Sequence, residues 1–562
     1  MIVKTKAKGL FAFLLPRWWL FLFFAVLLAL GFLTASQYGQ PWDERSEMDI
    51  LRMNAWEYQN ALGLDDSAVR AMANEEPHGA GYQREVPLTP ISQSIERDHG
   101  QSAYYPLFSV VMDASVTEAE RMEIWHHYTW VLFWIGAVAL YFCCRHMGMT
   151  RICSCMAVLM LCLSPRFFAE GHYNNKDIVL MSLTLLTLAQ ALALMRRPSM
   201  LRALCFGLVG ALAANTKIAG LALWGLCGIA VTVQLALQKR LDGKALRAGL
   251  CAIGSFVLFY ALLTPALWAN PMAYFSYGIQ NAAGFTRWGH TVLFRGALFD
   301  TSIHPLPWYY LPYMILTTTP LWILLLLVIG QSAAIVRICR RIPSDGRVPL
   351  ALCTALWLLP LLFAVVSQTP VYNGWRHFYF LYGPMLVLAA HGLNWFWEHA
   401  LHRVKRWQSH LRHAAIALLG LCMLTTGADM VLNHPHQYVY YNALVSKQDI
   451  NDYLERDYWN VSVLGALEQL SRLDMIQSAE QASTISGVNL WAQDALAKGL
   501  MLLEDNPLTL VNGEEETADY WLVNHTYSRP NPWIKTDTMY PVLQILAYGQ
   551  PLVTLYECAS AP

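Results

Sequence analysis

The chain has 562 residues, of which 56% are hydrophobic and only 14% are charged, and its mean hydropathy is +0.32. Soluble domains carry roughly a quarter charged residues, so this composition excludes an ordinary soluble protein and indicates an integral membrane protein. Basic and acidic residues number 39 each, and this zero net charge gives no reason to expect a nucleic-acid partner.

Eleven apolar segments are candidates for helices that cross a bilayer. They are predicted at residues 18–36, 126–143, 152–169, 178–195, 203–216, 218–237, 248–268, 312–336, 349–366, 376–394 and 413–431. The fifth of them is short. The first follows basic residues and precedes small ones, as a signal peptide does, but its length favours an uncleaved first helix.

The charges of the loops are consistent with this count. If the N-terminus is cytoplasmic, the cytoplasmic segments contain 21 of the 39 lysines and arginines. They contain only three acidic residues, Asp242, Asp345 and Glu398. Positive charge in every cytoplasmic loop is the pattern expected of a correctly counted membrane protein, because one missed span would invert every later loop.

The opposite side of the membrane then receives three large segments. These are a first loop at 37–125, a second large loop at 269–311 and a tail at 433–562. The predicted fold is therefore a polytopic helical membrane domain over 1–432, followed by a small periplasmic α/β domain over 433–562. In the tail, Asn460 to Leu473 is predicted as a helix, ADYWLVNH as a strand, and VLQILAY–GQ–PLVTLYE as a hairpin.

Ionisable residues gather where the predicted helices reach this far side. The first loop opens with Asp43 and Glu44, Lys176 and Asp177 follow the third span, Lys217 follows the fifth, and Arg376 and His377 follow the ninth. Ionisable groups at membrane depth are costly, so they usually serve a site or pair with each other.

The mixture of charges suggests a chemistry. Cations at a membrane surface can bind a lipid-linked phosphate, and arginine can do so with two parallel hydrogen bonds. A carboxylate can take a proton from an attacking hydroxyl. Together these groups could transfer a substituent from a phospholipid carrier to an acceptor, with the cations stabilising the phosphate as it leaves.

Several motifs resemble those of a known family. They are WDE after the first span, SPRFF…NNKD after the third, the lysine of ANTK, PWYYLPYMILTTTP, YNGWRHFYFLYGP, HPHQYVYYNALV and ERDYW. In their order and their placement on one membrane face, they resemble a bacterial GT-C glycosyltransferase, related to protein O-mannosyltransferases and to the aminoarabinose transferase of lipid A. The resemblance covers most of the chain.

This resemblance implies roles for individual residues. Asp43 would be the catalytic base, Glu44 would orient the acceptor or help to hold a metal ion, and Asp177 would supply another carboxylate. Lys217 and Arg376 would face the donor phosphate. Lys176 and His377 are further candidates for phosphate binding. The donor would be a polyprenyl-phosphate sugar, used in a single inverting displacement.

Some assignments stay open at this stage. Glu47 and Asp49 lie close to Asp43, so either could be the base instead. Asp43 could also simply cap a helix, and Lys217 could extend to the membrane interface. Asp177 could instead stabilise a helix through its charge, because a carboxylate in the first turn interacts favourably with the helix dipole. A divalent metal ion is a possible cofactor. Its candidate ligands, Glu44, Asp177, His172 and His290, lack a recognisable ligand spacing.

The second large loop carries three more candidate residues. Arg287, His290 and Arg295 could cover the donor or the acceptor, or could equally be anchors at the membrane interface.

The predicted function is a membrane glycosyltransferase of the bacterial inner membrane, with membrane lipids around it and a lipid, glycan or protein as acceptor. A transporter, or an inactive subunit that keeps the fold, are the alternatives. No internal repeat is visible and the charged groups lie at one membrane face, which favours the enzyme.

Overall fold

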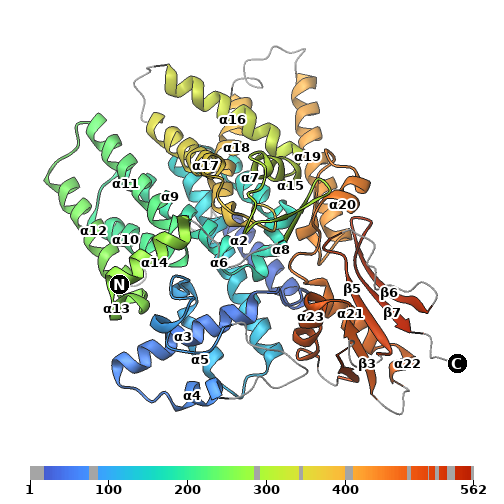
Figure 1. The fold of residues 1–562 in the computed structure, drawn as a ribbon. Helices are drawn as coiled ribbons and strands as arrows, with labels where there is room; N and C mark the ends of the chain where they lie inside the picture. The colour runs from blue at the N-terminus through green and yellow to red at the C-terminus, as the bar shows by residue number, and fades with distance from the viewer. Residues whose placement is uncertain are drawn as a thin grey trace, which may run out of the picture.

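The structure is a computed structural model that describes residues 18–74, 86–283, 291–340, 346–398, 409–477, 482–503, 506–512, 518–527 and 538–558. Helices make up most of the molecule, and a small sheet from the C-terminal part lies to one side of them (Figure 1).

Eight helices of the described residues are long and apolar enough to cross a membrane. They are α2 (Trp18–Thr34), α6 (Glu118–His146), α9 (Asp177–Arg196), α11 (Ala219–Leu237), α12 (Gly243–Leu263), α16 (Leu321–Cys339), α17 (Arg347–Ser367) and α19 (Ser409–Leu432). Each coincides with a predicted span, so the polytopic helical fold is confirmed.

The three other predicted spans are also helical but less regular. The third is bent by 73° between α7 (Arg151–Cys162) and α8 (Pro165–Tyr173), and would be a ninth span if the bent pair crosses as one. The proline at the start of α8 has no N–H to continue the preceding helix, which explains the break. The fifth is the 17-residue α10 (Met200–Thr216), and the tenth is split into η5 (Arg376–Leu381) and the 15-residue α18 (Tyr382–Phe396).

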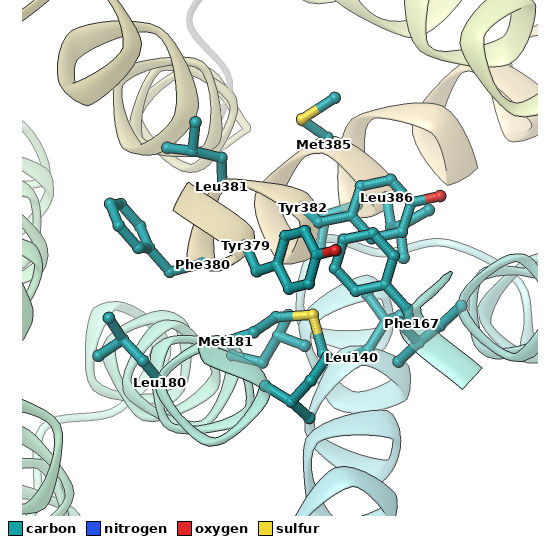
Figure 2. Packing of buried hydrophobic residues seen from close by; sticks show 14 of the residues in the cluster. Leu140, Phe167, Leu180, Met181, Tyr379, Phe380, Leu381, Tyr382, Met385 and Leu386 are labelled. Carbon is teal, nitrogen blue, oxygen red and sulfur yellow. The ribbon is translucent and has the colours of Figure 1, made fainter. Parts of the chain in front are cut away.

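Helix α9 is the centre of the helical domain. In the most apolar stretch of α9 that is long enough to cross a membrane, 89% of the residues are buried. In the same kind of stretch in α12, 22% of the residues are buried. Figure 2 shows the packing beside it, where Leu180 and Met181 of α9 face aromatic rings of the η5–α18 segment. Phe167 of α8 stacks on Tyr382 of α18, with ring centroids 4.0 Å apart. A rigid α9 therefore fixes the position of its first residue, Asp177.

The first loop is built mainly from helices. It contains η2 (Ala35–Gln37), α3 (Glu44–Leu62), α4 (Ser67–Asn74), η3 (Ile91–Gln93), η4 (Ser102–Leu107) and α5 (Phe108–Met112). The second large loop contains α13 (Ala266–Ala269), α14 (Pro271–Ala283) and a hairpin of β1 (Thr291–Phe294) with β2 (Ala297–Asp300). Helix α15 (Tyr310–Thr318) then leads into α16.

The tail forms a small domain around a five-stranded sheet. After η8 (Gln437–Val439), its helices are α20 (Lys447–Tyr453), α21 (Ser462–Ser471), α22 (Asp474–Gln477) and α23 (Leu490–Leu500). Its strands are β3 (Ser483–Gly487), β4 (Leu508–Leu510), β5 (Tyr520–Asn524), β6 (Met539–Ala547) and β7 (Gln550–Cys558), in the order β4-β3-β5-β7-β6.

The sheet of the tail is mixed. Strand β3 pairs in parallel with β4 and β5, whereas β7 is antiparallel to β5 and β6. The predicted helix, strand and hairpin are all present. The hairpin turns at Tyr548 and Gly549, one residue before the predicted turn at Gly549 and Gln550, and both turn residues have positive φ as a tight two-residue turn requires. The short strands β3 and β4 were not predicted. The sequence thus predicts the small α/β unit but not its complete sheet.

Candidate active site

A cavity of about 500 Å³ lies where the first loop, the tail and the ends of several membrane helices meet. Seven of the ten residues predicted to act in catalysis or binding line it. They are Asp43, Glu44, Lys176, Asp177, Lys217, Arg376 and His377. Residues from four separate stretches of the sequence thus share one site, at the membrane face that also carries the tail.

Asp43 stands at the N-cap position of α3, yet its side chain makes no capping hydrogen bond. Instead, Nη1 of Arg376 donates to Oδ2 of Asp43 over 3.2 Å. The side chain of Asp43 is 39% exposed, so one face of the carboxylate remains accessible. The side chain of Asp43 therefore does not cap α3, and its carboxylate contacts Arg376 in the cavity instead.

The charges form an alternating chain across the cavity. Nη1 of Arg376 lies 3.2 Å from Oδ2 of Asp43 and 3.9 Å from Oδ2 of Asp177. The ammonium group of Lys217 forms an ion pair with the other oxygen of Asp177. Two cations and two carboxylates therefore neutralise one another in a partly buried place, where an isolated charge would be strongly disfavoured.

Aromatic rings hold Arg376 in place. Its guanidinium carbon lies 4.4 Å from the ring centroid of Trp459 in the tail and 4.9 Å from that of Tyr372. Cation–π contacts of this kind stabilise a desolvated arginine. The backbone carbonyl of Trp459 also accepts a hydrogen bond from the Trp42 N–H over 3.0 Å, next to Asp43. The tail thus completes a wall of the site.

Asp177 is oriented by its neighbours. The side-chain amide of Asn174 donates to Oδ2 of Asp177 over 3.2 Å, and its carbonyl accepts the Asp177 backbone N–H over 2.9 Å. The same amide donates to the buried Glu170 over 2.7 Å, and Glu170 also accepts from the hydroxyls of Tyr379 and Tyr458 over 2.7 and 3.0 Å. This network fixes the start of α9, and so the carboxylate that pairs with both cations.

A second charged cluster lines another part of the cavity. Lys176 Nζ lies 2.5 Å from a carboxylate oxygen of Glu47 and 3.0 Å from Nδ1 of His99. Side-chain amides of Gln101 and Asn175 donate to the other oxygen of Glu47. Glu47 is thus held by three donors.

Glu44 faces inward from the start of α3. Nε2 of His126 lies 2.8 Å from one oxygen of its fully buried carboxylate, and Gln40 donates to the other over 3.1 Å. Its two oxygens are therefore both engaged by the protein itself.

Three of the four candidate metal ligands, Glu44, Asp177 and His172, contact other groups of the protein, and the fourth, His290, lies outside the described residues. Among the residues that the structure describes, no group of three or more His, Cys, Asp or Glu side chains is arranged to hold a metal ion. Glu44 is bound by His126 and Gln40, and Asp177 is paired with two cations. His172 stacks between Tyr38 and Trp130, with centroids 4.4 Å from each.

The other predicted residues have different positions. His377 lines the cavity, with its ring edge-on to Tyr372 at 4.6 Å, and burial raises the pKa of the Tyr372 hydroxyl to about 12. Arg295 is exposed at the tip of the β1–β2 hairpin, in a positive-φ conformation, and is not among the residues that line the cavity. Arg287 and His290 lie outside the described residues.

Some residues that line the cavity were not assigned a role from the sequence. Glu96, Asp98 and His99 come from the first loop, and Trp459 comes from the ERDYW motif. The run IERDHG is a dense group of charges and could have indicated the first three. Trp459 lies in a motif that was recognised, but nothing in its spacing indicates that the tail folds back over Arg376.

Comparisons with known proteins give a likeness in structure only. No family model matches the chain, and no curated protein matches its sequence. ArnT from Cupriavidus metallidurans bound to undecaprenyl phosphate is 13% identical, with a TM-score of 0.43, over 96% of this chain and 98% of that chain. The oligosaccharyltransferase AglB from Archaeoglobus fulgidus, in complex with an inhibitory peptide and a dolichol-phosphate, is 12% identical with a TM-score of 0.45.

The AglB match covers 86% of this chain and 64% of that chain. The arabinofuranosyltransferase AftD from Mycobacteria is 14% identical with a TM-score of 0.42, over 97% of this chain and 40% of that chain. These structural neighbours are all GT-C glycosyltransferases, at low sequence identity to this chain.

Proposed function

We propose that this chain is an integral membrane glycosyltransferase that moves a sugar from a polyprenyl-phosphate donor to an acceptor outside the cytoplasm. One observation carries the proposal. Asp43, Asp177, Lys217 and Arg376 come from four separate segments and form an alternating chain of charges in one cavity at the ends of apolar helices. That arrangement suits a substrate whose head group is anionic and whose tail stays in the lipid.

In this proposal, the cations bind the donor. Lys217 and Arg376 contact the phosphate, with Lys176 and His377 nearby, and they stabilise the negative charge that the phosphate gains as it leaves. Arginine suits this role because its planar fork matches two phosphate oxygens. The phosphate would then compete with Asp43 and Asp177 for the same cations.

Asp43 is the proposed general base. The acceptor hydroxyl attacks the anomeric carbon, its proton passes to the Asp43 carboxylate, and the bond between that carbon and the phosphate oxygen breaks. One such displacement inverts the anomeric centre and leaves polyprenyl phosphate as the second product. The exposed face of the Asp43 carboxylate offers a path for the acceptor.

The remaining carboxylates take supporting roles in the proposal. Asp177 pairs with Lys217 and Arg376 and positions both cations for the donor phosphate. Glu44 acts as a positioning residue, since its bonds to His126 and Gln40 fix the turn that carries Asp43.

The proposed location is a bacterial inner membrane with a cytoplasmic N-terminus. The first loop and the tail would then be periplasmic, because the basic residues gather in the loops at the opposite ends of the helices. We further propose that residues 1–432 form the membrane domain and that residues 433–562 form the periplasmic one.

The decisive test is sugar release by the purified full chain from a polyprenyl-phosphate sugar, with and without an acceptor extract. We expect Asp43→Asn to lose turnover while keeping donor binding and its elution as a folded protein. Asp65→Asn is the matched control, because Asp65 is an exposed acid of the same loop that accepts hydrogen bonds from the nearby Ser67 and does not line the cavity.

The alternatives predict other results. A transporter would release no sugar in any form, and would instead move a substrate across vesicles. An inactive subunit would bind the donor without turnover, and Asp43→Asn would change nothing. Either result would refute the proposal.

A further inference from the structure

A second cavity, of about 540 Å³, lies at the opposite end of the membrane helices. Arg196, the last residue of α9, lines it, whereas Asp177, the first residue of α9, lines the candidate active site. A helix of 20 residues is about 30 Å long, which is close to the thickness of the hydrocarbon core. The two cavities therefore open at opposite membrane faces.

Positive charge dominates the lining of this second cavity. Arg196, Arg240 and Arg337 come from three different segments, and His146 and His391 lie with them. None of the described residues that line the cavity is acidic. A single arginine at a helix end can simply extend to the interface. Three arginines around one hollow repel each other unless an anion lies between them.

Two of these arginines are held by the protein. Nη1 of Arg240 donates to the backbone carbonyl of Arg196 over 3.1 Å and to Oε1 of Gln238 over 3.0 Å. Arg337 packs against Gly346, where a Cβ would lie 3.0 Å from Nη2. The two acceptors of Arg240 are a carbonyl and an amide oxygen, which carry no full negative charge, so these bonds do not neutralise its guanidinium group.

We propose that this second cavity binds a phosphate group. Guanidinium groups match phosphate oxygens in geometry and charge, and basic pockets between membrane helices bind lipid head groups. The phosphate could belong to an anionic phospholipid of the adjoining leaflet or to a free phosphate ion. This site is separate from the proposed sugar transfer and does not depend on it.

The surroundings favour the lipid source. An adjoining cavity of about 490 Å³ shares His146 with the phosphate site. It is lined mainly by apolar side chains of α6, α9 and α10, including Trp134, Phe142 and Leu186. An acyl chain could lie there while its phosphate reaches Arg196.

The test uses the purified full chain in detergent, incubated with phosphatidylglycerol or phosphatidylcholine and examined by native mass spectrometry. We expect phosphatidylglycerol to be retained preferentially, and Arg240→Gln to weaken that retention by about fivefold, with a larger loss when Arg337→Gln is added. Arg197→Gln is the matched control, because Arg197 is exposed beside Arg196 and is not among the residues that line the cavity. Replacing both arginines by lysine checks folding and should restore most of the retention.

A second arm distinguishes the sources of phosphate. If wild type shows no lipid preference but inorganic phosphate raises its melting temperature, and the double glutamine variant loses that rise, the ligand is free phosphate. The proposal is overturned if neither probe binds. It is also overturned if Arg197→Gln loses binding as fully as the double variant does.

Discussion

Nη1 of Arg376 lies 3.2 Å from a carboxylate oxygen of Asp43 and 3.9 Å from one of Asp177. One guanidinium group thus joins two loops that are separated by more than a hundred residues in the sequence. Because the same group is proposed to receive the donor phosphate, donor binding would change the environment of Asp43. The pair therefore links the binding step to the activation of the acceptor.

Replacing Arg376 tests this link. Arg376→Lys keeps the charge but loses the planar fork and weakens the contacts with Trp459 and Tyr372. We expect kcat/KM for the donor to fall by about thirtyfold, which corresponds to roughly 2 kcal/mol for lost charge-assisted hydrogen bonds. Steady-state kinetics with varied donor concentration measures the effect.

The chain offers a close control for this variant. Arg70 pairs with Asp66 over 2.6 Å and lies 5.6 Å from the ring centroid of Trp56, but it is outside the cavity. Arg70→Lys should leave donor kinetics unchanged. Equal losses in the two variants would show that Arg376 acts only on the fold.

The identity of the base can be tested by comparing Glu47 with Asp43. Glu47 accepts from Lys176, Gln101 and Asn175, so its carboxylate is already fully engaged. We expect Glu47→Gln to lower kcat by less than about tenfold, and Asp43→Asn to lower it by about 10²–10⁴-fold, the range for loss of a general base. Rapid-quench measurement of a single turnover separates this chemistry from product release. The reverse order of effects would assign the base to Glu47.

Sequence patterns predicted more of the helices than of the contacts between them. Apolar length and loop charge predicted eight helices that the described residues confirm as long and apolar enough to cross a bilayer, because both signals follow from the thickness and polarity of a bilayer. The break at Pro165 could have been anticipated from its missing N–H. The contact of Trp459 with Arg376 could not, since it depends on how the tail domain docks, and no local pattern encodes docking.

The tail contributes a pH-dependent part of the stability. Burial raises the pKa of the Glu455 carboxyl to about 8, and Oε1 of this residue accepts from the Leu293 N–H over 3.3 Å. The folded state therefore keeps the proton that the unfolded state loses above its ordinary pKa of 4.5. The contribution of Glu455 to folding stability is therefore largest below pH 4.5, and it is lost as the pH rises toward 8.

Glu455→Gln should remove that dependence. Between pH 5 and pH 8, the wild-type free energy of unfolding should decrease by up to about 1.4 kcal/mol per pH unit from this group, whereas the variant should be flatter. Thermal melts of the purified chain at a series of pH values measure the difference. Parallel melting curves for the two proteins across this range would contradict the assignment.

Close packing of α16 on α18 makes a final prediction about the membrane domain. Gly330 of α16 lies against α18, where a Cβ would come within 1.8 Å of the Leu388 carbonyl oxygen, and Gly392 faces it in the same way against Leu326. Small residues let membrane helices approach at this distance. Gly330→Ala must therefore push the helices apart, and we expect the free energy of unfolding to fall by about 1–3 kcal/mol, measured as a lower melting temperature in detergent.

Gly254→Ala of α12 is the control, because a Cβ there meets no atom within 4 Å and the change favours the helix. If both variants melt at the wild-type temperature, the close approach of α16 and α18 does not contribute to stability.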